Sequence, residues 1–342
     1  MMEPTWLQFI WYLLFMVLLI GYSILDGFDL GVGVLSLFNR NRHERRLYMN
    51  AVAPVWDGNE VWLLTAGGAL FAAFPAVYAT VFSGFYLALM LVLVGLIARA
   101  VSLEFRGKIN STTWQTVWDR LFGIGSLLPA FLFGVAVGNL LRGIPLDEAG
   151  EFAGSFFGLL NPFSLLVGLL SVVMFVTHGA LYLAGKSPDK LRLRMLENAT
   201  KAWALWVLIW LAANLYGLFE APHLFANAMS SPWLWMIFLV MMGSLLFLPI
   251  AIRSQKPVQA LIVSSIAIGA TIAQAATALY PRLVFARNAP ELSLTVMNAS
   301  SSERTLMTML MIALIGMPLV IGYTIFIYRV FKGPVVLDEH SY

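Results

Sequence analysis

The sequence predicts an all-α integral membrane protein with nine transmembrane helices, and three observations lead to that prediction. The 342 residues are 60% hydrophobic and 11% charged, whereas a soluble domain has roughly a quarter of its residues charged. Nine apolar stretches reach or approach the roughly 20 helical residues that a bilayer core about 30 Å thick requires. They are continuous rather than alternating, which disfavours a β-barrel. The stretches are residues 5–38, 54–76, 78–103, 117–141, 162–183, 199–219, 232–252, 257–280 and 305–331.

The positions of Lys and Arg predict the orientation, because short positively charged loops stay in the cytoplasm. With the N-terminus outside, the odd-numbered connections and the C-terminal end face the cytoplasm. These regions contain 17 of the 21 Lys and Arg residues. Only Arg142, Arg282, Arg287 and Arg304 then lie outside. An N-out, C-in arrangement needs an odd number of spans, which nine satisfies.

The composition excludes several classes of function. The absence of cysteine removes disulfides, thiolate metal sites and cysteine nucleophiles. The net charge of +3 is scattered among apolar segments, so no nucleic-acid partner is expected. The sequence contains neither a phosphate-binding loop nor a zinc-protease helix motif. The connections are short, so any chemistry must take place within the helices or in a partner chain.

The first two stretches carry acids at membrane depth. Asp26 and Asp29 lie in the first, and Asp57 and Glu60 in the second; each pair is spaced i, i+3, which puts both acids on one helical face. Asp29 lies roughly 15 Å and Asp57 roughly 10 Å from the cytoplasmic helix ends, which predicts a band of four acids in that half of the membrane. Each acid costs about 2.5–3.5 kcal/mol on insertion scales and is therefore a functional candidate.

Two interpretations of this band stay open at this point. Buried carboxylates that exchange protons would carry them inward from the cytoplasm. Alternatively, Asp57 helps to cap its helix, while Asp26 and Asp29 hydrogen-bond the backbone or pair with Arg99.

Small residues on the same two stretches predict close contacts. Gly27 and Gly31 form a small-xxx-small pair, which is typical of tight helix packing. Gly67 and Gly68 open an alanine-rich run on which a neighbouring helix, or a flat ligand such as a quinone ring, can approach the backbone. Helix packing is the commoner use of such a run.

The later stretches add boundary markers and one histidine. Trp114 and Trp118 before the fourth stretch, and Trp233 and Trp235 at the start of the seventh, fit an interfacial belt. Of the four His residues only His178 lies in a span, so a bis-His haem site is not expected in this chain. His178 is expected to hydrogen-bond or relay a proton near a helix end.

Seven segments together resemble subunit II of the cytochrome bd family of respiratory quinol oxidases. They extend from the first stretch to the connection before the last one, and their joint occurrence in register with nine spans is highly specific. The segments are residues 26–33 (DGFDLGVG), 56–62 (WDGNEVW), 67–75 (GGALFAAFP), 82–86 (FSGFY), 138–141 (GNLL), 160–163 (LNPF) and 297–301 (MNASS).

The resemblance implies two four-helix bundles, residues 5–141 and 162–280, and a peripheral ninth helix, residues 305–331. It implies a multi-pass subunit of the bacterial inner membrane that stabilises a haem-bearing subunit I. That partner is expected to carry two b-type haems and one d-type haem, oxidise quinol and reduce dioxygen with cytoplasmic protons, which makes the reaction electrogenic. This chain is expected to ligate no haem; a bound quinone, lipid and a small single-helix accessory subunit are further expected partners.

The resemblance also assigns roles to residues. Asp57 matches the acid proposed to line a proton-input channel at the subunit interface. Glu60 and His178 stand where some relatives have Gln, which implies that the Glu60 carboxylate is dispensable to that route. The expected proton pathway therefore consists of Asp57, Asp26, Asp29 and Glu60, without a catalytic or metal-ligating residue.

Two other functions remain as alternatives. Acids at membrane depth and Gly-interrupted helices also suit a proton-coupled secondary transporter, although the chain has no evident pair of repeats with broken helices in matching positions. A purely structural scaffold for subunit I is the other alternative.

Overall fold

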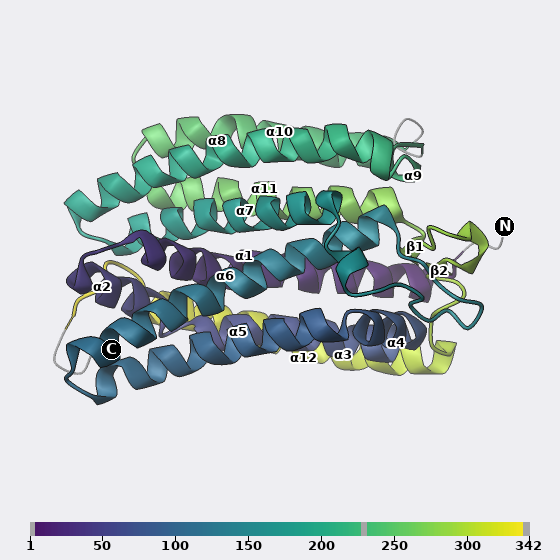
Figure 1. Ribbon diagram of the computed structural model, residues 1–342, viewed down its shortest axis with the longest axis horizontal. Coiled ribbons are helices and arrows are strands. Elements are labelled where there is room, and N and C mark those ends of the chain that lie inside the picture. Colours follow the sequence, from purple (N-terminus) through teal and green to yellow (C-terminus); the bar gives the residue numbers. More distant parts are fainter. Residues whose placement is uncertain (1–3, 227–230, 338–342) are drawn as a thin grey trace.

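The computed structural model describes residues 4–226 and 231–337, and most of them lie in long helices that run along one direction (Figure 1). The helices are α1 (Trp6–Phe38), α2 (Arg42–Val52), α3 (Trp56–Ala73), α4 (Pro75–Gly84), α5 (Tyr86–Phe105), α6 (Thr112–Arg142), α7 (Pro162–Lys186), α8 (Asp189–Glu220), α9 (His223–Ala226), α10 (Pro232–Arg253), α11 (Pro257–Leu279) and α12 (Glu303–Val330). The shorter elements are η1 (Arg106–Lys108), η2 (Phe157–Leu159), β1 (Arg282–Val284), η4 (Pro290–Leu292) and β2 (Leu294–Thr295).

Several helices begin at residues that favour a helix start. Thr5 and Gln8 form a capping box at the start of α1. The Asn161 side chain caps α7 by accepting the Ser164 N–H. Proline occupies the first turn of α4, α7, α10 and α11, where its missing N–H would have had no helical partner. The predicted starts at residues 162, 232 and 257 are confirmed.

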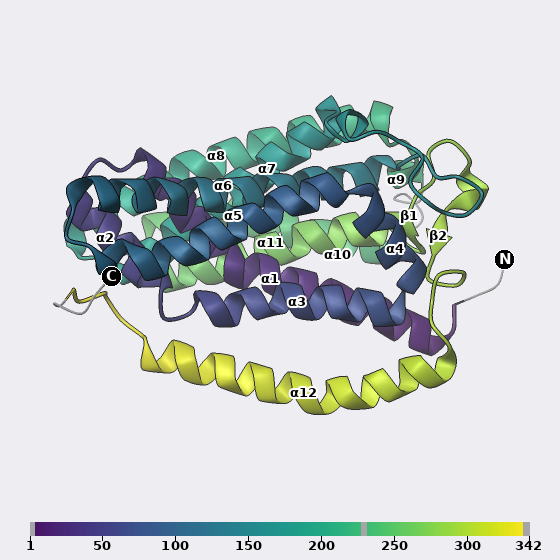
Figure 2. The same cartoon turned by 60° about the horizontal axis from the view of Figure 1, so that its bottom comes forward.

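Eight helices of the described residues are long and apolar enough to cross a membrane: α1, α5 with η1, α6, α7, α8, α10, α11 and α12. The remaining predicted stretch, residues 54–76, forms α3. Its first turns contain Asp57, Asn59 and Glu60, and these polar residues lower its hydropathy. α3 nevertheless lies along α1 in the bundle (Figure 2).

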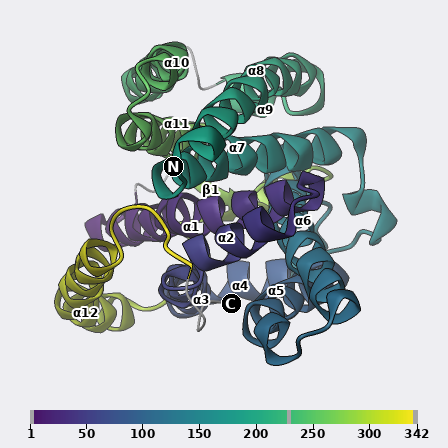
Figure 3. The same ribbon diagram turned by 90° about the vertical axis from the view of Figure 1, so that its left-hand side faces the viewer.

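α1 lies in the middle of the molecule when the bundle is viewed end-on (Figure 3). It packs against α3, α6, α7 and α11. α8 and α10 lie beyond α7 and α11, whereas α12 lies at the opposite periphery and packs against α1 and α3 (Figures 2 and 3).

Glycines allow α1 and α7 to cross closely. A Cβ atom on Gly31 would lie 1.9 Å from the Phe175 carbonyl oxygen, and one on Gly179 would lie 2.6 Å from the Val32 nitrogen. A Cβ on Gly27 would lie 2.8 Å from the Phe175 ring. The predicted close packing at Gly27 and Gly31 is confirmed, and α7 is the partner helix.

The predicted stretch 78–103 is wrong in its first part. Pro75 cannot donate the N–H that would continue α3, and the chain leaves helical geometry at Phe74 (φ −134°, ψ 64°). A second break at Phe85 (φ −100°, ψ 17°) separates α4 from α5. The spanning helix therefore begins at Tyr86, and α4 is a separate short helix. α6 and α8 also start earlier than predicted, at Thr112 and Asp189, because polar residues extend both helices beyond their apolar parts.

The two ends of the bundle carry elements that the sequence did not predict. We call them the α2 end, which contains α2, and the hairpin end, which contains the antiparallel strands β1 and β2 (Figure 1). At the α2 end, Asp119 of α6 accepts hydrogen bonds from Arg106 (2.6 Å) and from Arg45 of α2 (3.4 Å). At the hairpin end, the Ser301 N–H donates to the Ala73 carbonyl at 2.8 Å and so caps α3.

Candidate functional site

Asp26 of α1 and Arg99 of α5 form a buried ion pair within the apolar part of the bundle. An Arg99 guanidinium N–H donates to Asp26 Oδ1 at 2.7 Å, and the two side chains are 1% and 0% exposed. Two unpaired charges would be very costly at this depth, but each neutralises the other. The alternative in which Asp26 pairs with Arg99 is confirmed.

Glu60 connects this pair to the surface of α3. The other terminal nitrogen of Arg99 donates to Glu60 Oε2 at 3.2 Å, and the Glu60 side chain is 19% exposed. Arg99 therefore joins one fully buried carboxylate to one at the rim of the bundle. The resemblance implied that the Glu60 carboxylate is dispensable to the proton route. In the structure, this carboxylate contacts the buried cation Arg99 directly.

Asp29 is buried but has no cation as a direct partner among the described residues. Its Oδ2 accepts a hydrogen bond from Asn59 Nδ2 at 2.8 Å. The same Asn59 amide donates to the Leu25 carbonyl at 3.1 Å, and its Oδ1 accepts from the Tyr328 hydroxyl of α12 at 2.9 Å. Tyr328 thus donates to Asn59, and Asn59 donates to Asp29. Together the two residues orient one Asp29 oxygen.

Asn59 and Tyr328 were not recognised from the sequence. The signal for Asn59 was its position between Asp57 and Glu60 in an apolar stretch, where a polar amide is as unusual as an acid. Tyr328 had no such signal, because a tyrosine near a helix end fits an interfacial belt. Only the packing of α12 against α3 gives it its role.

Asp57 is the exposed member of the four acids. It occupies the first turn of α3 with an exposed side chain. The predicted capping role is wrong, because the N-cap residue of α3 is Val55 and no side chain caps that end. The four acids differ in burial: Asp26 and Asp29 are interior, Glu60 is at the rim, and Asp57 faces outward. The i, i+3 spacing put Asp57 and Glu60 near one face but carried no information on which face meets α1.

The exposed side of α3 forms a continuous stripe that we call the α3 face. Its members recur at helical spacing along the whole helix and combine large apolar side chains with a glycine. Leu64 and Phe71 are 71% and 60% exposed, and a Cβ on Gly67 or Gly68 would have no neighbour within 4 Å. The α3 face consists of Asp57, Val61, Leu64, Gly68 and Phe71. No helix in the described part of the chain covers the Gly67–Gly68 surface that was predicted to allow close approach.

Four polar atoms around the buried acids have no hydrogen-bond partner among the described residues. They are the Tyr22 hydroxyl, Asp26 Oδ2, Asp29 Oδ1 and Arg99 Nε. Tyr22 precedes Asp26 by one helical turn on α1, so three of these atoms lie along one stripe of that helix. Buried polar groups are normally paired, which distinguishes this region from an ordinary packed core.

His178 uses both ring nitrogens within the protein. Nε2 lies 3.0 Å from the Ile24 carbonyl oxygen, and Nδ1 lies 2.7 Å from the Ser264 hydroxyl. A carbonyl oxygen only accepts, so Nε2 carries the hydrogen and Nδ1 faces the hydroxyl. Neither nitrogen is free to ligate haem iron, and His178 instead joins α7 to α1 and α11.

The other histidines do not assemble a metal site. His43 is exposed on α2, and His340 lies outside the described residues. His223 stacks on the Phe285 ring with centroids 3.9 Å apart. Burial lowers the pKa of His223, and Arg282 and Arg287 lower it further, against a hydrogen bond with the Leu141 backbone. Within residues 4–226 and 231–337, no group of three or more His, Asp or Glu side chains is arranged to hold a metal ion. These residues do not fit a haem.

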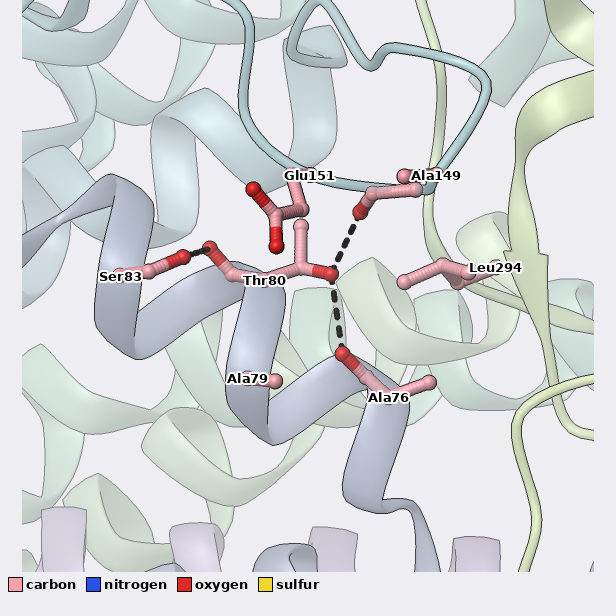
Figure 4. A pocket seen from close by; sticks show the side chains of 8 residues that line it. Ala76, Ala79, Thr80, Ser83, Ala149, Glu151 and Leu294 are labelled. Atoms are coloured by element: carbon pink, nitrogen blue, oxygen red, sulfur yellow. Dashed lines mark hydrogen bonds between the residues drawn. The ribbon is translucent and has the colours of Figure 1, made fainter.

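A pocket of about 200 Å³ lies far from the acids, at the hairpin end (Figure 4). α4, the segment around Gly150 and Leu294 of β2 line it. The Thr80 hydroxyl donates to the Gly150 carbonyl at 2.7 Å and so joins two of its walls. Glu151 is its only ionisable lining residue, and none of the predicted site residues reaches it.

Comparison with known proteins gives one consistent result. The family model described as "Cytochrome bd terminal oxidase subunit II" matches residues 7–331. The chain is 38% identical to "Cytochrome bd-I ubiquinol oxidase subunit 2" of Escherichia coli strain K12, with 100% of both chains covered. It is 34% identical to "Cytochrome bd ubiquinol oxidase subunit 2" of Bacillus subtilis strain 168, over 96% of this chain and 97% of that one.

The fold is also similar to a solved structure. A chain of the bd oxidase from Geobacillus thermodenitrificans superimposes with a TM-score of 0.80 at 19% sequence identity. The match covers 96% of this chain and 99% of that chain. The arrangement of helices in Figure 1 is therefore shared with a bd oxidase subunit.

Proposed function

The chain belongs to the cytochrome bd terminal oxidase subunit II family, and from this membership we propose how it serves its complex. It is a subunit of a bd-type quinol oxidase, an oxidoreductase of the respiratory chain, and a multi-pass protein of the bacterial inner membrane. The haems of the complex belong to the partner, subunit I. We propose that this chain stabilises subunit I and supplies it with cytoplasmic protons along the α3 face.

The exposed position of Asp57 is the observation that carries this proposal. A carboxylate on the outward side of an otherwise apolar membrane helix has no favourable contact with lipid. Large apolar side chains and an open glycine surface follow it along the same stripe. Such a stripe suits close packing of another chain, with Asp57 at the entrance of the contact.

Arg99 divides the four acids between two tasks. A guanidinium stays protonated in proteins and therefore does not pass a proton on. Glu60 lies on the outer side of Arg99, one turn from Asp57, whereas Asp26 lies on its inner side. We assign proton uptake to Asp57 with Glu60 as its neighbour, and we place Asp26, the counterion of Arg99, and Asp29 behind this route.

The finer topology belongs to the same proposal. We propose nine spans, with α3 as the second, in an N-out, C-in arrangement that puts the α2 end in the cytoplasm. The distribution of Lys and Arg supports this orientation. The division into bundles of residues 5–141 and 162–280, with residues 305–331 peripheral, is supported by the position of α12 outside α1 and α3. A chain without cysteine allows single-cysteine labelling from each side of the membrane as the test.

We also propose which haems and which further partners the assembled complex contains. Two b-type haems and one d-type haem in subunit I follow the family resemblance. The outward side of α12 is exposed and apolar along its length, including Ile315 and Leu319 at 71% and 69% exposure. This side suits contact with lipid or with a small single-helix accessory subunit.

The decisive experiment replaces Asp57 by Asn in the whole complex. We expect quinol-driven oxygen uptake to fall by about tenfold or more, because a missing proton-transfer group commonly costs that much or more, while the haem spectrum is unchanged. Glu60→Gln keeps an oxygen for Arg99 and is expected to have a smaller effect. Glu148→Gln, an exposed acid near the opposite end, is the matched control. Loss of haem from Asp57→Asn would support a purely structural role, and wild-type uptake would refute the route.

A further inference from the structure

The interior of the bundle contains more acids than cations. Asp26 and Asp29 are 0% and 1% exposed, and Glu60 is at the rim beside them. Arg99 is the cation of this group, and two carboxylates already share it. With Asp26 and Glu60 ionised, the group has a net charge of −1 before Asp29 is counted.

Within the described part of the chain, no other group near Asp29 compensates for a further negative charge. α3 contributes the uncharged amide of Asn59, and α12 contributes the Tyr328 hydroxyl through that amide. α7 contributes His178 and Tyr182, whose polar atoms contact the Ile24 carbonyl, Ser264 and the Ala51 carbonyl. α6 contributes Asp119, which is paired with Arg106, and α11 has no ionisable side chain between Pro257 and Leu279.

Two like charges one helical turn apart are strongly unfavourable where water is excluded. Asp26 and Asp29 are related by i, i+3 on α1, so their carboxyl groups lie on one side of the helix. When two acids share a site with insufficient positive charge, one of them keeps its proton. Asp26 has the direct contact with Arg99, and Asp29 has an uncharged partner on one oxygen only.

The buried polar atoms without a hydrogen-bond partner among the described residues also indicate Asp29 as the acid that keeps a proton. Asn59 occupies Asp29 Oδ2, whereas Asp29 Oδ1 is buried without a partner. The Tyr22 hydroxyl and Asp26 Oδ2 are also buried and have no hydrogen-bond partner in the described ranges. A set of buried oxygens, some able to donate and some to accept, can take up or release a proton without breaking the ion pair with Arg99.

We propose that Asp29 binds an exchangeable proton inside subunit II, so that the buried group stores one proton beside the α3 face. Asp29 is the neutral acid of the group, and Arg99 keeps Asp26 and Glu60 ionised. Release leaves the Asp29 carboxylate and a free proton, and uptake reverses this. The function of this bound proton depends on the proposed proton route. The protonation of Asp29 itself does not depend on that route.

Infrared difference spectroscopy of the intact oxidase tests the proposal directly. We expect wild type minus Asp29→Asn to contain the carbonyl band of a protonated carboxylic acid, which shifts in D₂O and with ¹³C-labelled aspartate. Asp57→Asn is the matched control, because it removes an exposed aspartate and is expected to leave the band in place. Asn at position 29 is uncharged and still accepts from Asn59, so the variant is expected to assemble with its haems.

Each result of this experiment is decisive. A difference spectrum without the band, or with ionised-carboxylate bands in its place, would overturn the proposal. A band that does not shift in D₂O would mean that the proton does not exchange, and would overturn it as well. If Asp29→Asn fails to assemble, Asp29→Glu, which keeps a carboxyl group at this position and shifts its carbonyl band, gives the same readout. A normal rate for Asp57→Asn together with a clear Asp29 band would refute the route alone.

Discussion

Arg99 is the side chain that pairs with both Asp26 and Glu60. It is 1% exposed and contacts a fully buried aspartate and a rim glutamate. Pairing in the interior adds little net stability, but removing one partner leaves an uncompensated charge. The residue is therefore more critical for folding than its number of hydrogen bonds suggests.

Replacing Arg99 by Gln is expected to destabilise the complex by about 3–5 kcal/mol, because Asp26 loses its buried counterion. Thermal unfolding of the purified oxidase measures the effect. The double variant Asp26→Asn with Arg99→Gln is expected to recover part of the loss, since it removes both charges. Arg304→Gln, an exposed arginine, is the control, and an Arg99→Gln variant as stable as wild type would contradict this interpretation.

His223 gives the subunit a predictable response to acid. Burial and two nearby arginines lower its pKa in the folded state, whereas the unfolded residue titrates near pH 6.5. As pH falls below that value, the unfolded state binds a proton before the folded state does, so stability decreases. His223→Gln is expected to flatten the decline in melting temperature between about pH 7.5 and about pH 5.5. An equally steep decline in the variant would exclude His223 as its source.

At this scale the sequence identified the acids and offered Arg99 as a partner of Asp26, but it did not identify Asn59 or Tyr328. Asp26, Asp29, Asp57 and Glu60 stood out because ionisable residues are rare in membrane helices. Their separation into interior, rim and surface positions depends on the rotation of α1 and α3 about their axes. The i, i+3 spacing alone does not determine that rotation.

Among the elements, α1 and α7 form the contact that tolerates least change. Their backbones touch at Gly31 and Gly179, where a Cβ atom would lie 1.9 Å and 2.6 Å from backbone atoms of the other helix. Backbone atoms cannot rotate away as a side chain does. Separation of the two helices would also displace His178 from the Ile24 carbonyl.

Gly31→Ala is expected to cost at least about 1–3 kcal/mol, because overpacking forces the two helices apart. Gly243→Ala on α10 is the matched control, since its Cβ would have no neighbour within 4 Å. Thermal stability of the two variants in the same detergent gives the comparison. Equal stability would show that the crossing accommodates a methyl group.

Local residues such as proline predicted the helix boundaries better than hydropathy did. Starts marked by proline, such as those of α7 and α11, were predicted correctly. The amphipathic α2 was missed because it does not enter the apolar stretches, and β1 and β2 because strands of two or three residues leave no periodic pattern. α4 was merged with α5 because both are apolar, and the break at Phe85 has no proline or glycine at that position.

For the whole molecule, the α3 face is the surface whose partner matters most. It joins an acid, large exposed apolar side chains and an open glycine surface along one helix. Surfaces of this kind on membrane helices are typical of helix–helix contacts between chains. The proposed function requires subunit I to cover it.

Gly68→Trp is expected to block assembly with subunit I, because its side chain would occupy the surface that the partner approaches. Gly243→Trp, which also meets open space within this chain, is expected to be tolerated. Co-purification of subunit I and the haem absorbance per milligram of complex measure assembly. Normal haem content in Gly68→Trp would move the partner to another face.

The pairing of Asp26 with Arg99 also constrains how the protein is made. The two residues are 73 positions apart in the chain, so α1 leaves the ribosome long before its counterion is synthesised. At about 5–20 residues per second, this delay is on the order of several seconds to about fifteen seconds. During that time α1 carries two acids that lipid does not accommodate, which favours its retention at the insertion machinery until α5 arrives. The first helices are then released into the bilayer together.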